Sequence, residues 1–226
     1  MISFADDLFV STGRRTDWPR FAAWHYRSHK IGLVKSIALL WHGRPSDEAY
    51  DRVARLLPDA PPDPRRRLAI AAGRPLRPQS PRPIGIAVFV SPPMSLSGRN
   101  AFFGRRGRWG RLEMQALNRS VCLLQRLVLH PTYRGAGLAG PFLEAACERT
   151  GLPWVETLSE LGERHPVFER AGFVRVGRVK LPPQKRTRAG HSALFGGRAV
   201  TAETFHKSAH ASPTYFIRRS KTTPSR

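Results

Sequence analysis

The sequence has few cysteines, no long apolar run and few acidic residues. Its two cysteines, Cys122 and Cys147, are too few for a disulfide framework, so we expect a reduced, cytoplasmic compartment. The longest apolar run, residues 84–90, has seven residues, whereas a membrane-spanning helix needs ~20. The first ten residues contain two acids and no basic stretch, unlike a secretory signal. Together these absences predict a protein that neither crosses nor enters a membrane.

Acidic residues are outnumbered by basic ones. The 226 residues include 38 Lys+Arg and 16 Asp+Glu, a net charge of +22, and all but six of the cations are arginine. Such a charge favours anionic partners, with RNA or DNA as one candidate class. An arginine-rich composition that only keeps the chain soluble is the simpler explanation. Hydrophobic residues make up 41% and charged residues 24%, which is ordinary for a globular chain.

Proline and basic residues suggest how the chain is divided. Residues 58–83 hold eight prolines and six arginines, a density that blocks helix interiors and sheet ladders. We therefore expect one domain over residues 1–180 with an irregular Pro/Arg-rich insertion at 58–83. Residues 181–226 form a basic, partly irregular tail, in which the β-prone residues 214–217 predict a final strand.

A second basic segment, residues 99–111, alternates five arginines with the aromatics Phe102, Phe103 and Trp109. Arginine beside aromatic rings can hold single-stranded nucleic acid by stacking and phosphate contact. The simpler interpretation is a solvated loop whose aromatic side chains pack into the core.

The remaining sequence predicts alternating helices and strands. Apolar, β-prone stretches predict strands at 34–41, 84–90, 121–129, 154–158 and 173–179. Helical spacing and capping residues predict helices at 17–29, 46–57 and 166–171, and one that follows a glycine-containing turn and ends near 149.

The segment that carries chemistry lies between residues 127 and 177. A buried strand runs into a turn with Gly135, Gly137 and Gly140 and then into an amphipathic helix. The unpaired N–H groups and the dipole at a helix N-terminus attract anions. Glycine lets a phosphate approach the backbone closely, and Arg134 can add a charge-assisted contact. The pattern therefore predicts a bound phosphate or pyrophosphate.

The glycine turn partly fits one nucleotide-binding motif and lacks a second. The spacing of the three glycines fits the bare G-x-G-x-x-G pattern of dinucleotide-binding proteins, and Glu156 lies near the expected acidic position. No convincing strand–helix–strand unit accompanies it, so this remains a minor alternative. A P-loop is excluded because no Gly-Lys-Ser/Thr follows the glycines.

The run HPTYRGAGLA, residues 130–139, resembles motif A of the GNAT N-acetyltransferase superfamily, whose pattern is Gln/Arg-x-x-Gly-x-Gly/Ala. Downstream, HPVFERAGFVRVG, residues 165–177, resembles the next motif of that family. The two motifs and the interval between them cover about 60 residues. Other stretches are similar to a poorly characterised bacterial and phage branch, some of whose members are fused to transporter-type ATPases.

The resemblance implies an α/β fold with a mixed, mostly antiparallel, centrally splayed sheet and helices on both faces. It also implies acetyl-CoA, whose acetyl group would pass directly from the thioester to an amine. The resemblance assigns cofactor binding to the backbone of the strand and the turn, at Leu127, Val128, Leu129, Arg134, Gly135, Ala136, Gly137, Leu138 and Ala139. An N–H near Leu129 would stabilise the oxyanion.

The sequence departs from the family at Phe168, where many relatives have a tyrosine that protonates the leaving thiolate. Glu156 and His165 are the candidate catalytic residues, each with a plain structural alternative. Glu156 fits a strand surface, and His165 fits the cap of a helix.

The resemblance also places His25, Tyr26 and His29 on the acceptor side. The spacing of the two histidines suits zinc, but further ligands are missing, so we expect no metal.

Two functions follow from these observations. The first is an acetyl-CoA-dependent N-acetyltransferase that acts on a primary amine. The alternative is a catalytically silent protein of the same fold whose arginine-rich segments bind nucleic acid or a ribonucleoprotein.

Overall fold

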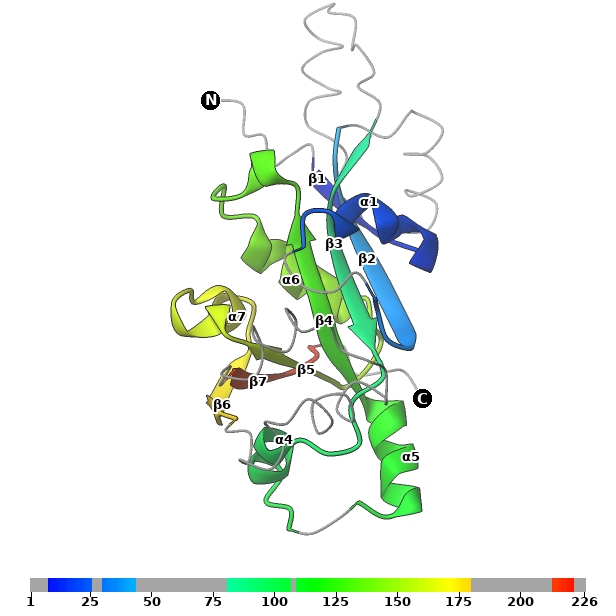
Figure 1. The fold of residues 1–226 in the computed structure, drawn as a ribbon, viewed down its shortest axis with the longest axis vertical. Helices are drawn as coiled ribbons and strands as arrows, with labels where there is room; N and C mark the ends of the chain where they lie inside the picture. Colours follow the sequence, from blue (N-terminus) through cyan, green and yellow to red (C-terminus); the bar gives the residue numbers. More distant parts are fainter. Residues whose placement is uncertain (1–7, 26–29, 44–80, 107–108, 180–212, 222–226) are drawn as a thin grey trace, which may run out of the picture.

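The protein is described by a computed structural model in residues 8–25, 30–43, 81–106, 109–179 and 213–221. These residues form a seven-stranded sheet (Figure 1). The strands lie in the order β1-β2-β3-β4-β5-β7-β6, and every neighbouring pair is antiparallel except β4 and β5. In chain order the strands are β1 (Leu8–Thr12), β2 (Val34–His42), β3 (Arg82–Val90), β4 (Val121–Leu129), β5 (Trp154–Ser159), β6 (Val174–Arg178) and β7 (Thr214–Arg219).

Five helices and three short 3-10 turns accompany the sheet in the described residues. The helices are α1 (Pro19–Ala22), α4 (Ser97–Phe102), α5 (Arg111–Ser120), α6 (Ala139–Glu148) and α7 (Val167–Arg170). The 3-10 turns are η2 (Arg15–Asp17), η3 (Pro131–Tyr133) and η4 (Leu161–Glu163). No described helix combines the length and apolar character that crossing a bilayer requires.

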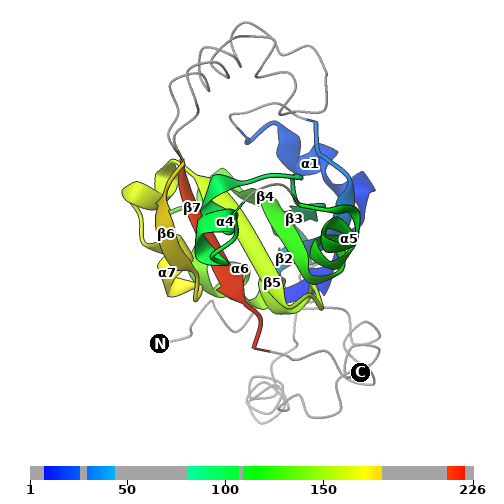
Figure 2. The ribbon, with the colours of Figure 1, turned by 90° about the horizontal axis from the view of Figure 1, so that it is seen from below.

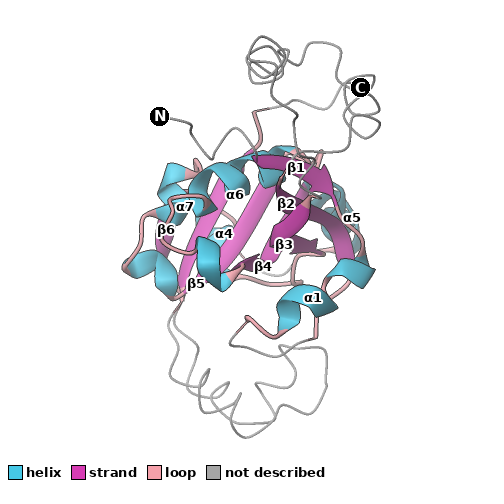
Figure 3. Ribbon diagram, turned by 90° about the horizontal axis from the view of Figure 1, so that it is seen from above, coloured by secondary structure: helices cyan, strands magenta, loops and turns pink. Residues whose placement is uncertain are grey.

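Two apolar layers cover the two faces of the sheet (Figure 3). On one face, α6 contributes Phe142 and Leu143 and α7 contributes Phe168, and all three are buried. On the other face, Trp18 and Phe21 from the segment around α1 cover the inner strands. The predicted fold class is confirmed, because helices lie on both faces of a mostly antiparallel sheet.

The helix α4 lies on the face opposite α6, against the strands β7 and β6 (Figure 2). A side chain at Gly98 would place its Cβ 2.5 Å from Cγ of Tyr215, so only glycine allows this close approach. The neighbouring Arg99 is thereby carried under the helix and is completely buried.

The strands predicted from apolar runs are confirmed, with shifts of one or two residues at their ends. The predicted strand at 214–217 is also present, and it lies inside the sheet between β5 and β6. Thus part of the segment described as a tail completes the same sheet. The predicted helices at 166–171 and up to 149 correspond to α7 and α6.

Other expectations need correction. The helix predicted at 17–29 is shorter: α1 spans only Pro19–Ala22 and follows a 3-10 turn. Proline is tolerated at the first helical position, which suits the start at Pro19. Residues 26–29 of the predicted span lie outside the described residues. Residues 99–111, interpreted as a loop, begin in α4 and end in α5. The strand β1 was not predicted. The helix predicted at 46–57 lies outside the described residues, as does the insertion up to residue 80.

Candidate functional site

The strands β4 and β5 run side by side only at their first three residues. Their pairing begins at Val121 with Trp154 and ends at Leu123 with Glu156. Beyond this point Thr157 donates one side-chain hydrogen bond to the Leu124 carbonyl, at 3.1 Å, and the strands then diverge (Figure 1). The last five residues of β4 therefore have no strand partner on the β5 side among the described residues.

The backbone of the free half of β4 presents hydrogen-bonding groups to this opening. In an antiparallel ladder, alternate residues direct both their N–H and C=O to the same side. The N–H of His130 bonds to Ile84 of β3, so Leu127 and Leu129 direct their polar groups toward the gap. The carbonyl of Leu129 accepts from Arg134. The backbone groups of Leu127 therefore remain available to an extended ligand that lies along the strand.

The turn after β4 is open and shaped by two glycines. Gly135 and Gly137 have φ values of 83° and 75°, in a region that side chains rarely adopt. An added Cβ at either residue would meet no atom within 4 Å, and residues 134–137 are exposed. None of the N–H groups of residues 135–139 donates to another described backbone group. They adjoin the N-terminus of the ten-residue helix α6, which adds a partial positive charge.

The start of α6 accommodates Pro141 without a break. The helix begins at Ala139, so the proline lies in the first turn, where the missing N–H has no intrahelical acceptor. Phe142, Leu143 and Ala146 anchor the helix in the core. The exposed turn is consequently held in place by a rigid element.

The side chain of Arg134, expected to contact a phosphate, forms hydrogen bonds to two backbone carbonyls of the chain. Its Nε donates to the Leu129 carbonyl at 3.1 Å, and its Nη2 donates to the Trp24 carbonyl at 3.0 Å. The guanidinium thus ties the turn to the end of the α1 segment. Two of its nitrogens are engaged in this way, whereas the backbone amides of residues 135–139 have no described backbone acceptor.

The cofactor-side residues predicted from sequence are brought together at one place. Leu127, Val128 and Leu129 form the free end of β4, and the residues 134–139 form the turn that follows directly. Sequence analysis missed one long-range contact of Tyr133, the residue that precedes this turn. The Tyr133 hydroxyl lies 2.6 Å from Nδ1 of His42 at the end of β2, a long-range contact with no local signal.

Glu156 lies at the apex of the opening but is not exposed there. Its side chain is completely buried. Arg99 donates to both carboxylate oxygens, from Nε at 2.9 Å and from Nη2 at 3.0 Å. The Tyr215 hydroxyl donates to Oε2 at 2.8 Å, and burial, with the nearby Glu156, raises the pKa of that tyrosine. These hydrogen bonds hold the carboxylate inside the protein, and its catalytic role stays a prediction.

The two partners of Glu156 were not recognised as functional from the sequence. Arg99 belongs to a basic segment interpreted as solvated, and Tyr215 belongs to a short β-prone stretch near the end of the chain. Neither lies within fifty residues of Glu156. A lone acid on an apolar strand, in a chain with excess arginine, is the only signal that could have indicated such a pair.

The other candidate residues lie apart from Glu156. His165 is exposed and precedes α7, and its N–H bonds to Leu161. Phe168 is buried against Phe173 and Phe216. His25 packs edge-on against Trp18 at a centroid distance of 6.0 Å, whereas Tyr26 and His29 lie outside the described residues.

Neither cysteine is suited to nucleophilic chemistry. Burial raises the pKa of Cys122 to about 12, and burial also raises the pKa of Cys147. Both thiols therefore stay protonated near neutral pH and pack as small apolar groups. Within the described part of the chain, no three His, Cys, Asp or Glu side chains gather as a metal site.

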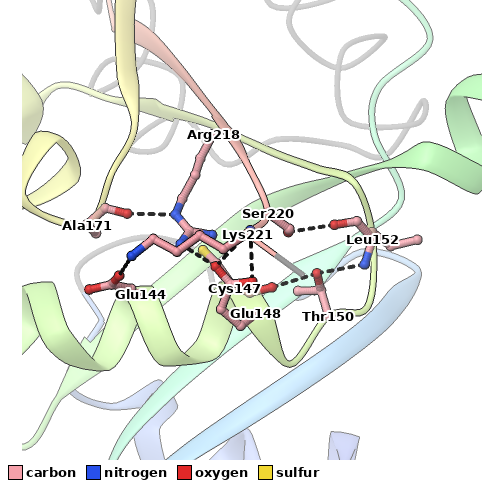
Figure 4. Close-up of polar contacts among 9 residues, drawn as sticks. All are labelled: Glu144, Cys147, Glu148, Thr150, Leu152, Ala171, Arg218, Ser220 and Lys221. Carbon is pink, nitrogen blue, oxygen red and sulfur yellow. Dashed lines mark hydrogen bonds and ion pairs between the residues drawn. The ribbon is translucent and has the colours of Figure 1, made fainter. Parts of the chain in front are cut away.

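The far end of α6 is clamped to β7 by ionic contacts (Figure 4). Arg218, which is buried, pairs with Glu148 and donates from Nε to the Ala171 carbonyl at 2.8 Å. Lys221 pairs with Glu144 at 2.6 Å. The clamp fixes the helix whose other end carries the glycine turn.

Comparison with known proteins returns solved structures only. No family model and no curated protein matches the chain. A GCN5-related N-acetyltransferase from Kribbella flavida is 10% identical, with 95% of this chain and 98% of that chain covered and a TM-score of 0.44. The aminoglycoside acetyltransferase AAC(6')-Ib in complex with coenzyme A is 13% identical, with 94% of each chain covered and a TM-score of 0.41.

A third solved structure, a spermidine N-acetyltransferase chimera from Vibrio cholerae and hSSAT, is 10% identical, with 97% of this chain and 99% of that chain covered and a TM-score of 0.40. At such identities and TM-scores these neighbours do not decide the activity of this chain.

Proposed function

We propose that the chain is an acetyl-CoA-dependent N-acetyltransferase that transfers the acetyl group to a primary amine. One observation carries the proposal: the free half of β4 leads directly into an exposed glycine turn at the start of α6. An extended ligand with a pyrophosphate near one end fits both features at once, since the arm pairs with a strand and the phosphates meet backbone amides. Coenzyme A has this form.

The residues of the chain would act mainly by positioning. The backbone of Leu127 would hold the pantetheine arm, and the amides of residues 135–139 would hold the pyrophosphate. The amine nitrogen would form a bond to the thioester carbonyl carbon, the carbon–sulfur bond would break, and the amine proton would pass to a base. Glu156 and His165 are the proposed bases.

The acceptor would approach from the face that carries α1, where His25, Tyr26 and His29 are proposed to contribute. Phe168 cannot protonate the leaving thiolate, so that proton would come from water or from another side chain, or the thiolate would leave without one. The closer relation to the branch fused to transporter-type ATPases stays a prediction, as does a cytoplasmic location.

Thermal unfolding with acetyl-CoA tests the proposal. A ligand at 100 times its Kd adds about 2.7 kcal/mol, which raises the midpoint by several degrees in a chain of this size. We expect this rise for the native protein and its loss in Gly137→Glu, which places a carboxylate where the pyrophosphate would lie. Gly151→Glu is the matched control, since that glycine also has positive φ and open space but lies beyond the other end of α6.

An amine screen that detects free coenzyme A thiol then separates the two functions. Thiol release that depends on an amine supports the transferase. If acetyl-CoA raises the thermal midpoint but no amine causes release of the coenzyme A thiol, the catalytically silent protein is favoured. If Gly151→Glu loses the midpoint rise as completely as Gly137→Glu does, the turn is not the binding site and the proposal fails.

A further inference from the structure

An exposed aromatic cluster lies where α4 meets the beginning of β5. Phe102, Phe103 and Trp154 contact each other edge to face, with ring centroids 5.0 to 5.8 Å apart. Phe102 is 36% exposed and Phe103 is 40% exposed. Exposed phenylalanines of this kind are not needed to fill the core, and their rings are accessible to a flat partner.

Arginine borders this cluster. Arg219 is exposed, pairs in register with Trp154 across β5 and β7, and places its guanidinium carbon 5.8 Å from the tryptophan ring centroid. Arg106 is exposed three residues after Phe103. Neither arginine forms an ion pair with a described carboxylate. Arg105 differs, because it pairs with Glu113 and lies over Trp109.

We propose that Phe102, Phe103, Trp154 and Arg219 form a binding surface for single-stranded nucleic acid. Unstacked bases would lie on the exposed rings, and the arginines would contact the phosphates. The partner follows from charge complementarity: the net charge of +22 attracts polyanions, and aromatic rings beside arginine select those polyanions that carry unpaired flat bases. A fully stacked duplex offers no such base faces.

The surface and the proposed acetyl-CoA site lie at opposite ends of the sheet. Trp154 pairs with Val121 at the beginning of β4, whereas the glycine turn follows Leu129 at its end. At ~3.3 Å per residue, the nine residues of β4 separate the two by about 26 Å. Binding at one end therefore leaves the other open, and the inference does not rest on the proposed transferase activity.

Fluorescence anisotropy with a labelled oligonucleotide of about 12 thymidines tests the proposal on the full chain, over a range of salt concentrations. Phe103→Ala should weaken binding between about 5-fold and 150-fold, the range for the loss of one base–aromatic stack. Phe103→Leu keeps an apolar side chain against Trp154 but removes the ring, so it should show the same loss. The thermal midpoint of each variant verifies that it is folded.

Two variants that each remove one positive charge distinguish binding at this surface from attraction by the net charge of the whole chain. Arg219→Ala should reduce the slope of log affinity against log salt by about 0.7, the value for one phosphate contact with a single strand. Arg164→Ala removes an equal charge from an exposed residue near α7 and should leave the slope unchanged.

Three results would each overturn the proposal. The first is equal weakening by Arg219→Ala and Arg164→Ala, which indicates binding through net charge alone. The second is native affinity in Phe103→Leu, which excludes ring stacking. The third is a duplex of the same length that competes as well as the single strand.

Discussion

The two halves of the sheet are held in different ways. The half made of β1 to β4 is covered on one face by an apolar layer that includes Trp18, Phe21 and Val88. The half made of β5, β7 and β6 also has an apolar face, but four arginine–glutamate ion pairs lie in it as well, and two of them join segments that are distant in sequence. The buried members, Arg99 and Arg218, join this half to α4 and to the end of α6.

This difference bears on the separation of β4 from β5 beyond their first three residues. β4 pairs with β3 over most of its length but with β5 over only three positions. Apolar contacts are non-directional and would allow the two halves to slide or close. Hydrogen-bonded ion pairs are directional, and removing one partner of a buried pair strongly destabilises the folded protein. The ion pair at Arg99 joins α4 to β5, and the ion pair at Arg218 joins β7 to the end of α6, so both hold elements of the second half in place.

We expect the largest effect when the carboxylate of Glu156, at the last paired position of β4 and β5, is removed. Glu156→Ala leaves Arg99 buried without its partner, and we expect the free energy of unfolding to fall by about 3–5 kcal/mol, measured by urea denaturation. The double variant Arg99→Met with Glu156→Leu replaces the pair by apolar groups and should recover most of that loss. If the single variant is as stable as the native protein, the ion pair does not hold the second half.

A smaller effect is expected at the clamp between β7 and α6 (Figure 4). Arg218→Met removes the ion pair to Glu148 and the bond to the Ala171 carbonyl. Because Glu148 is partly exposed and can be hydrated, we expect a loss of about 2–3 kcal/mol in unfolding free energy. Acetyl-CoA should still raise the thermal midpoint, since the glycine turn lies at the other end of α6. A loss confined to ligand binding, with stability unchanged, would contradict a structural clamp.

The smallest effect is expected at the outer pair of the same clamp. Lys221 holds the pKa of Glu144 below its usual range through a hydrogen bond and its charge, and both side chains are largely exposed. A lowered carboxyl pKa stabilises the fold above the unfolded pKa, and this contribution is lost as the pH falls through the folded pKa.

Lys221→Ala should therefore cost at most about 1 kcal/mol near neutral pH and nothing in strong acid, with the difference reduced by salt. Unfolding curves at several pH values measure this. A cost that persists in strong acid would show that Lys221 acts by packing.

The candidate site was predictable where its chemistry is local. The turn at Gly135 and Gly137 follows from glycine content after an apolar strand, and both residues adopt the positive φ that such a turn requires. The surroundings of the catalytic candidates were harder to predict, because segments distant in sequence supply them. Glu156 looked like a strand residue with a free carboxylate, and only α4 and β7 determine that it is buried and paired.

The sequence by itself determined every strand position except that of β1, together with the glycine turn and the basic charge, because periodicity, glycine geometry and charge act over a few residues. It did not determine which arginines are buried, why α4 docks on β7, or where β4 parts from β5. Those features depend on contacts between residues fifty or more positions apart, such as Arg99 with Glu156. Local composition makes every arginine look solvated, and only the packed fold decides which of them, here Arg99 and Arg218, are buried.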